Sequence, residues 1–288
     1  MAKSASHKFG QIIGDLLEVT MLKYLGPIAR KHSLYLDYKH RRDARGGKKE
    51  VVWKDINGNK HKLDIVFEKN GSEQVLGQPL AFVEMAWRRY TKHSKNKAQE
   101  MQGAILPLIA KYNKYAPFYG AVLAGEFTAP SIAQMESEGF KIVYFEYSTI
   151  IKAFNLVGID VYWGEDTTEG ELSEKVAQYE NLSKRDIEKV IDSLIEQNKM
   201  ELERFIQKLD ESLLREIESV SVFSLHGMSK LLNSVKEAYD YIISYDEKAT
   251  KAPLVKYEII IRYNNGDRIE AQFREKYKAL AFLTEYMG

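Results

Sequence analysis

Two carboxylates stand in stretches of the sequence that are otherwise apolar. Asp64 lies within the run LDIVF and Glu84 within the run LAFVEMA, about twenty residues further along the chain. An ionised carboxylate in a buried strand is costly unless it is paired or binds a cation. One such residue is often part of a structural ion pair. Two of them in neighbouring predicted strands can instead converge on one Mg²⁺, which prefers carboxylates, water and phosphate oxygens.

A carboxylate pair that holds Mg²⁺ suits the hydrolysis of a phosphodiester, because the ion polarises the phosphate and lowers the pKa of a bound water. The sequence offers little for other chemistries. It has no cysteine, which excludes disulfides, thiolate zinc sites, iron–sulfur clusters and a cysteine nucleophile. The six histidines are scattered without metal-ligand spacing, and no serine-hydrolase elbow, phosphate-binding loop or dinucleotide fingerprint is present.

The elements that would position the two acids follow an α/β pattern over about the first 165 residues. Asn57-Gly58 is a strong hairpin signal between two apolar runs, the second of which contains Asp64. The segment around Glu84 is apolar throughout, as expected of a central strand that is buried on both faces. In chain order the sequence predicts a helix over 8–31, this hairpin, a strand over 79–86, a helix over 94–112, a strand over 120–125, a short helix over 130–139 and a strand over 141–147.

This order, with an acid on the hairpin and a second acid on the next strand, resembles the PD-(D/E)XK nuclease superfamily and, within it, type II restriction endonucleases. The resemblance implies that Asp64 and Glu84 hold Mg²⁺ and that a lysine two residues after Glu84 assists the attacking water. That position is Ala86 in this chain, so the family pattern is broken there.

In some members of the superfamily the lysine has moved to the following helix, where this chain offers Lys92, Lys95 and Lys97. Lys95 and Lys97 lie on opposite flanks of the apolar stripe of that helix. We expect Lys97 to reach the site. The alternative, that all three contact DNA phosphates or only water, remains open.

Two further acids are candidates for the site by the same resemblance. Glu18 lies on a half-buried flank of the first predicted helix, where several branches of the superfamily carry an acid that acts through water. Glu100 has the spacing of a metal-binding glutamate found on the helix in some restriction enzymes. A helical projection places Glu100 nearly opposite the apolar stripe, which favours exposure.

The net charge of +1 conceals a basic first part, with 22 Lys and Arg against 11 Asp and Glu in residues 1–120. This asymmetry favours a polyanionic partner. The predicted phosphate contacts next to Glu84 are Arg88, Arg89, Lys92 and Lys95. A second basic group, Arg41, Arg42 and Arg45, lies on a loop that could enter a DNA groove. The alternative for that loop is a solvated surface.

The rest of the chain has a different character. Residues 166–250 show heptad-like apolar spacing and predict a helical region for dimerisation or target recognition, and residues 251–288 predict a small ββα element. The expected fold class is therefore α/β, a restriction-endonuclease-like mixed sheet flanked by helices, with these two additions.

The predicted function is that of a Mg²⁺-dependent, sequence-specific endonuclease acting on double-stranded DNA, in the cytoplasm and without a membrane span. By the resemblance we expect a homodimer, because two strands need two sites, and a cognate DNA methyltransferase as partner. Two alternatives stay open: a repair or junction-resolving nuclease of the same fold, and a catalytically inactive DNA-binding protein.

Overall fold

The computed structural model describes residues 4–225, 228–249 and 253–287. The chain divides into two compact units, Met1–Asp210 and Glu211–Gly288. Each unit has its own sheet and helices. No helix in the described ranges has the length and apolar character that crossing a membrane requires.

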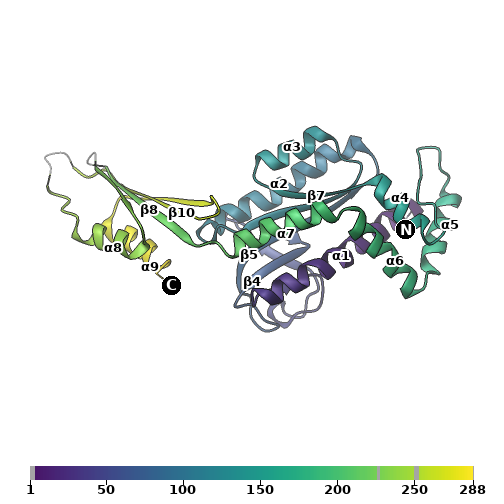
Figure 1. The fold of residues 1–288 in the computed structure, drawn as a ribbon, viewed down its shortest axis with the longest axis horizontal. Helices are drawn as coiled ribbons and strands as arrows, with labels where there is room; N and C mark the ends of the chain where they lie inside the picture. Colours follow the sequence, from purple (N-terminus) through teal and green to yellow (C-terminus); the bar gives the residue numbers. More distant parts are fainter. Residues whose placement is uncertain (1–3, 226–227, 250–252, 288) are drawn as a thin grey trace. The chain divides into compact units, whose positions relative to one another are not determined.

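The first unit contains the elements predicted for the α/β pattern (Figure 1). Its helices are α1 (Ala5–Lys31), α2 (Ser94–Lys111), α3 (Ala129–Ser137), α4 (Tyr147–Asn155), α5 (Glu169–Glu180), α6 (Lys184–Gln197) and α7 (Lys199–Leu213), with short 3₁₀ turns η1 (Asp43–Arg45), η2 (Thr91–His93) and η3 (Asn113–Tyr115). Its strands are β1 (Tyr35–Asp37), β2 (Val51–Lys54), β3 (Lys60–Leu63), β4 (Ile65–Lys69), β5 (Gln78–Arg88), β6 (Phe118–Gly125) and β7 (Lys141–Glu146).

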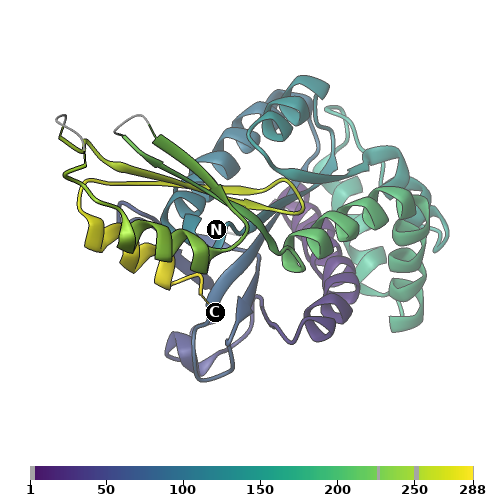
Figure 2. The ribbon, with the colours of Figure 1, turned by 60° about the vertical axis from the view of Figure 1, so that its left-hand side comes forward.

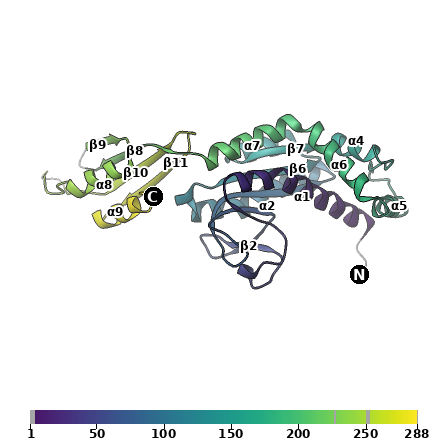
Figure 3. The same cartoon turned by 60° about the horizontal axis from the view of Figure 1, so that its bottom comes forward.

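Five of these strands form a mixed sheet in the order β1-β4-β5-β6-β7. The β1–β4 and β4–β5 pairs are antiparallel, whereas β5–β6 and β6–β7 are parallel and joined through α2 and α3. The predicted mixed sheet flanked by helices is confirmed. Strands β2 and β3 form a separate two-stranded hairpin, and Figure 3 shows the part that carries β2 outside the sheet.

Helices cover both faces of the five-stranded sheet. On one face, alternate residues of β5 and β6, such as Phe82 and Ala121, pack with α2 and α3 in a continuous hydrophobic core. On the other face, Gly10 of α1 lies against Trp87, and Phe205 of α7 packs on Phe118 beside Gly120. A side chain at position 120 would collide with the Phe205 ring, so glycine there lets α7 approach β6 closely.

The heptad-like apolar residues of α6 and α7 are buried within this unit. Val190, Leu194, Leu202 and Leu209 are buried, and α5 and α6 contact α1 and α4. These helices therefore extend the core beyond residue 165, and their apolar residues do not need a second subunit for burial.

The second unit is a four-stranded antiparallel sheet in the order β11-β10-β8-β9, with two helices. Its elements are β8 (Ile217–Ser224), β9 (Met228–Leu232), α8 (Val235–Ser244), β10 (Tyr257–Tyr263), β11 (Arg268–Phe273) and α9 (Lys276–Thr284). Figure 2 shows α8 and α9 on the same face of this sheet.

The predicted helical region over 166–250 is helical as far as Leu213, but the described residues beyond it form the strands β8 and β9 as well as the helix α8. From Ile217 the run IESVSVFS alternates, so that Val220, Val222 and Ser224 are buried, and period-two burial specifies a strand. The predicted ββα element of the tail is confirmed, but β8, β9 and α8 complete it into a larger sheet unit.

Candidate active site

Asp64 and Glu84 lie side by side where the β2–β3 hairpin joins the sheet. Asp64 occupies the bend between β3 and β4, and the β4–β5 register places it next to Glu84, since Ile65 pairs with Val83. Glu84 Oε1 accepts a hydrogen bond from the Asp64 N–H at 3.0 Å. Asp64 Oδ2 accepts one from the Met85 N–H at 2.7 Å. Each acid is therefore fixed by the backbone of the other strand, and the structure brings the two predicted acids together.

Burial is the dominant influence on the protonation of this pair. Only 8% of Glu84 is exposed, and burial, together with the negative charge of Asp64, raises the pKa of Glu84 well above its usual value. Burial also raises the pKa of Asp64, against the Met85 N–H and the charges of Lys97 and Lys39, which lower it. Two adjacent carboxyls that ionise reluctantly are the electrostatic setting that a bound cation relieves.

The donor set of the pair fits Mg²⁺, because both side chains offer hard oxygen ligands. Within the described ranges, no three His, Asp or Glu side chains gather closely enough to hold a metal by themselves. Mg²⁺ usually binds through one or two carboxylates and keeps the remaining positions for water and substrate phosphate. Asp64 and Glu84 are the residues that would hold it.

A cavity of about 210 Å³ opens between α1 and the strand ends beside Asp64. Glu18 of α1 lines it, and its pKa is raised by burial and then by the negative charge of Asp64. Glu18 thus belongs to the electrostatic environment of Asp64, and its action through water stays a prediction. The cavity is lined by Gln11, Gly14, Asp15, Leu17, Glu18, Lys39, Asp64, Met85, Ala86 and Trp87.

Of the three candidate lysines on the segment after β5, Lys97 is the one that acts on both acids. Its charge lowers the pKa of Asp64 and of Glu84, and its side chain is 24% exposed. Lys92 and Lys95 are exposed. Glu100 is 61% exposed and lies 3.3 Å from the Lys97 ammonium, outside the cavity lining. The exposure that the helical projection favoured for Glu100 is what the structure shows.

The arginines after Glu84 are held by the fold. The Arg89 Nε donates to the Trp163 carbonyl at 2.7 Å, and the guanidinium lies 4.3 Å from the centre of the Tyr147 ring. Arg88 donates to the Trp87 carbonyl and lies 3.8 Å from Glu100. Both arginines thus have structural contacts within the chain, and their contact with DNA stays a prediction.

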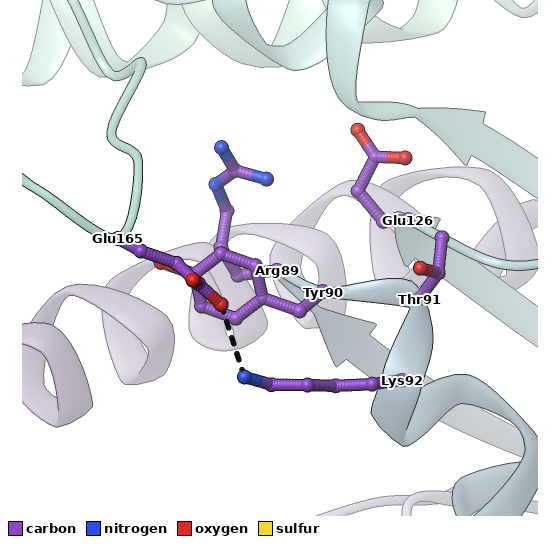
Figure 4. Close-up of a pocket in the computed structure, with 6 residues that line it drawn as sticks. All are labelled: Arg89, Tyr90, Thr91, Lys92, Glu126 and Glu165. Atoms are coloured by element: carbon purple, nitrogen blue, oxygen red, sulfur yellow. Dashed lines mark hydrogen bonds and ion pairs between the residues drawn. The ribbon is translucent and has the colours of Figure 1, made fainter.

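A second cavity, of about 220 Å³, lies beside Arg89 and is shown in Figure 4. Lys92 reaches across it to Glu165 at 3.1 Å. Its lining residues are Arg89, Tyr90, Thr91, Lys92, Glu126 and Glu165. Two cations and two carboxylates meet here, so the cavity has no strong preference for an anion.

The prediction that Arg42 and Arg45 contact DNA is wrong. Arg42 is fully buried and binds Glu68 through two hydrogen bonds, of 2.7 and 3.0 Å, and Asp37 at 2.8 Å. The Arg45 side chain is 6% exposed and pairs with Asp37. A guanidinium satisfied in this way stabilises the loop and is not free to enter a groove. Arg41 is the exposed member of the three.

Sequence reasoning missed Lys39 as a site residue. It lies in the loop between β1 and η1, lines the cavity beside Glu18 and Asp64, and lowers the pKa of both. In the sequence it stands 25 residues before Asp64, within a basic run that also contains residues with structural roles. No local signal distinguishes it from them.

Comparisons with known proteins identify no relative of established function. No protein-family profile matches the chain, and no curated protein matches it significantly. A solved structure titled "Crystal Structure of Protein of Unknown Function AF1548" aligns with 64% of this chain and 98% of its own at 11% identity, with a TM-score of 0.31. A likeness this distant carries no argument about what the chain does, so the site itself is the basis for any assignment.

Proposed function

We propose that this protein is a Mg²⁺-dependent endonuclease that hydrolyses phosphodiester bonds in double-stranded DNA, in the manner of a type II restriction enzyme. The observation that carries the proposal is the reciprocal bonding of Asp64 and Glu84 at the junction of β3, β4 and β5. A purely structural acid pair would be expected to have a cationic partner in contact, as Asp37 and Glu68 have in Arg42. No ion pair to Asp64 or Glu84 occurs in the part of the chain described.

The roles of the residues follow from their positions. Bound Mg²⁺ would polarise the phosphate and acidify a water molecule. Asp64 and Glu84 would hold the cation, and the hydrogen bond that each carboxylate accepts from a backbone N–H keeps both side chains in place. Glu18, whose pKa is raised by burial and by the charge of Asp64, lines the cavity and is placed to exchange a proton with a water molecule that enters it. Lys97 contributes positive charge from α2.

The order of the elements also supports the proposal. A helix, an antiparallel strand pair bearing the two acids, a second helix and a parallel strand follow one another as the resemblance to PD-(D/E)XK nucleases implies. In a restriction system the enzyme would act in the cytoplasm as a homodimer, with one site for each DNA strand, beside a cognate DNA methyltransferase.

The test is incubation of the protein with plasmid and phage DNAs of differing methylation in the presence of Mg²⁺. We expect discrete fragments from the wild type, and none from Asp64→Ala or Glu84→Ala. Glu136→Ala, an exposed acid on α3, is the matched control and should cleave as the wild type does.

Each other outcome changes the proposal in a defined way. Cleavage confined to branched DNA would indicate a junction-resolving nuclease. Intact DNA together with tight binding would indicate an inactive DNA-binding protein, the alternative that Ala86 favours. Cleavage that survives both substitutions would show that the site is elsewhere.

A further inference from the structure

We propose that Lys39, in the loop between β1 and η1, binds the scissile phosphate in place of the lysine that is absent at Ala86. The inference rests on the proposed function. It adds to the site a cationic residue that the resemblance to PD-(D/E)XK nucleases did not imply.

The first argument is the geometry of the cavity. Lys39 and Ala86 line the same space, together with Asp64 and Glu18. Among the described residues that line it, Lys39 is the one that carries a positive charge at neutral pH. Ala86 is buried, with its methyl group in the core that packs on α2, so it brings no cation to this space.

The second argument is that the Lys39 ammonium is available. Lys39 is exposed, and within the described residues it makes no hydrogen bond and no ion pair. It nevertheless lines the same cavity as the acids Glu18 and Asp64. Lys97 differs from Lys39 on both points: its ammonium lies 3.3 Å from Glu100, and its side chain does not line the cavity. Lys39 is therefore free to bind an incoming anion beside the metal ligands.

The third argument is that the backbone around Lys39 is held rigidly. On its N-terminal side, buried Asp37 pairs with both Arg42 and Arg45. On its C-terminal side, the His40 carbonyl accepts a hydrogen bond from Arg45. The His40 ring also lies 4.5 Å from the ring of Tyr38. A loop fixed at both neighbours of Lys39 presents one flexible side chain from a defined position, which limits the ordering entropy of binding.

The loop that carries Lys39 is also hydrogen-bonded to the connection between β4 and β5. The Arg42 guanidinium donates to the carbonyls of Ser72 and Val75 at 2.7 to 2.9 Å, in addition to its bonds to Glu68. Arg42 and Arg45 are in this way positioning residues for Lys39, which gives the buried arginines a part in the site.

The chemistry assigned to Lys39 is electrostatic. In hydrolysis the oxygen of a water molecule forms the new bond to phosphorus and its proton passes to solvent, while the bond to the leaving sugar oxygen breaks and that oxygen takes up a proton. Charge develops on the oxygens around phosphorus during this step. An ammonium that donates to a nonbridging oxygen stabilises that charge and keeps its own protons. Lys39 would thus contribute to catalysis and, more weakly, to binding.

The first measurement is DNA binding in EDTA as a function of salt, which does not depend on cleavage. A lysine that contacts one phosphate should, when replaced, lower the slope of log Kd against log salt by about one. We expect this change for Lys39→Ala, little change for Lys39→Arg, and none for Lys69→Ala. Lys69 is an exposed lysine at the opposite end of β4 and is the matched control. Because the Lys39 side chain makes no hydrogen bond or ion pair with any described residue, the thermal unfolding of Lys39→Ala should match that of the wild type.

The second measurement is the single-turnover cleavage rate at saturating DNA and Mg²⁺. Loss of one donor to the developing charge reduces the rate by about 100-fold, so we expect this loss for Lys39→Ala and a substantial recovery for Lys39→Arg. A wild-type rate for Lys39→Ala, or an unchanged salt slope, would overturn this inference while the proposed function stands. Wild-type protein that leaves every DNA intact would overturn the proposed function, and this inference with it.

Discussion

Replacing Glu84 with glutamine should stabilise the metal-free protein while abolishing its activity. Glu84 is almost fully buried beside Asp64, and its pKa is raised well above the usual value because the charged form is desolvated. Glutamine has nearly the same shape, and its side-chain oxygen can still accept the 3.0 Å hydrogen bond from the Asp64 N–H. The substitution therefore removes the unfavourable charge and keeps the packing.

The sign of the pH dependence follows from the raised pKa. A carboxyl that binds its proton more tightly in the folded state than in the unfolded state contributes stability at low pH and loses it as the pH rises through the folded pKa. Below the pKa of the unfolded state, wild type and Glu84→Gln should be equally stable. As the pH rises toward 8, the wild type must either bury the charged Glu84 carboxylate or keep this carboxyl protonated at a pH at which the unfolded chain ionises it. Both options cost free energy, so the difference in the free energy of unfolding in favour of Glu84→Gln should grow.

The magnitude follows from the linkage between pKa and free energy. Each unit by which folding raises the pKa corresponds to about 1.4 kcal/mol once the pH exceeds the folded value. Single stabilising substitutions commonly raise the free energy of unfolding by about 0.5–2 kcal/mol, and we expect Glu84→Gln to fall in this range. For a folded unit the size of Met1–Asp210, this gain in the free energy of unfolding corresponds to a rise in Tm of roughly 1–8 °C.

The assay is thermal or urea unfolding in EDTA between pH 4 and pH 8, with Glu136→Gln as the exposed control. We expect the control to stay within about 0.5 kcal/mol of the wild type at every pH. Mg²⁺ should then stabilise the wild type and have little effect on Glu84→Gln, because the variant has lost a ligand. A Glu84→Gln protein that is less stable than the wild type at pH 8, or a difference independent of pH, would refute the assignment of Glu84 as a strained metal ligand.

Two further predictions concern the basic residues. Arg42→Ala should reduce the free energy of unfolding by about 3–5 kcal/mol, measured by urea denaturation, because it leaves Asp37 and Glu68 buried without their partner; a loss below about 1 kcal/mol would contradict the network described. Lys97→Met should slow single-turnover cleavage by about 100-fold because its charge acts on both acids. Lys95→Met, from the exposed flank of α2, should lose less, and equal effects would show that neither lysine is specific to the site.

Much of the first unit could be predicted because its signals are local. The order of helices and strands follows from apolar periodicity, which the sequence carries directly. The pairing of Asp64 with Glu84 was predictable for a related reason. A carboxylate within an apolar strand has few ways of being satisfied, and a hairpin followed by a neighbouring strand leaves the two acids close together.

Other features depended on which segments pack together. Arg42 and Lys39 stand three residues apart in one basic run, yet Arg42 points into an acidic pocket formed by Asp37 and Glu68 while Lys39 reaches the cavity. Charge patterning indicates how many cations a segment carries but not which of them meets a buried acid 26 residues away. That choice is made by the register of β1 on β4.

The sequence by itself therefore determined the α/β core, the two acids and the loss of the expected lysine at Ala86. Only the tertiary structure decided that α6 and α7 belong to the core of the first unit, that Ile217–Ser224 is a strand in a second sheet, and that Lys39 lines the same cavity as Asp64. The physical reason is that periodicity reports how one element is buried, whereas long-range packing selects its partner.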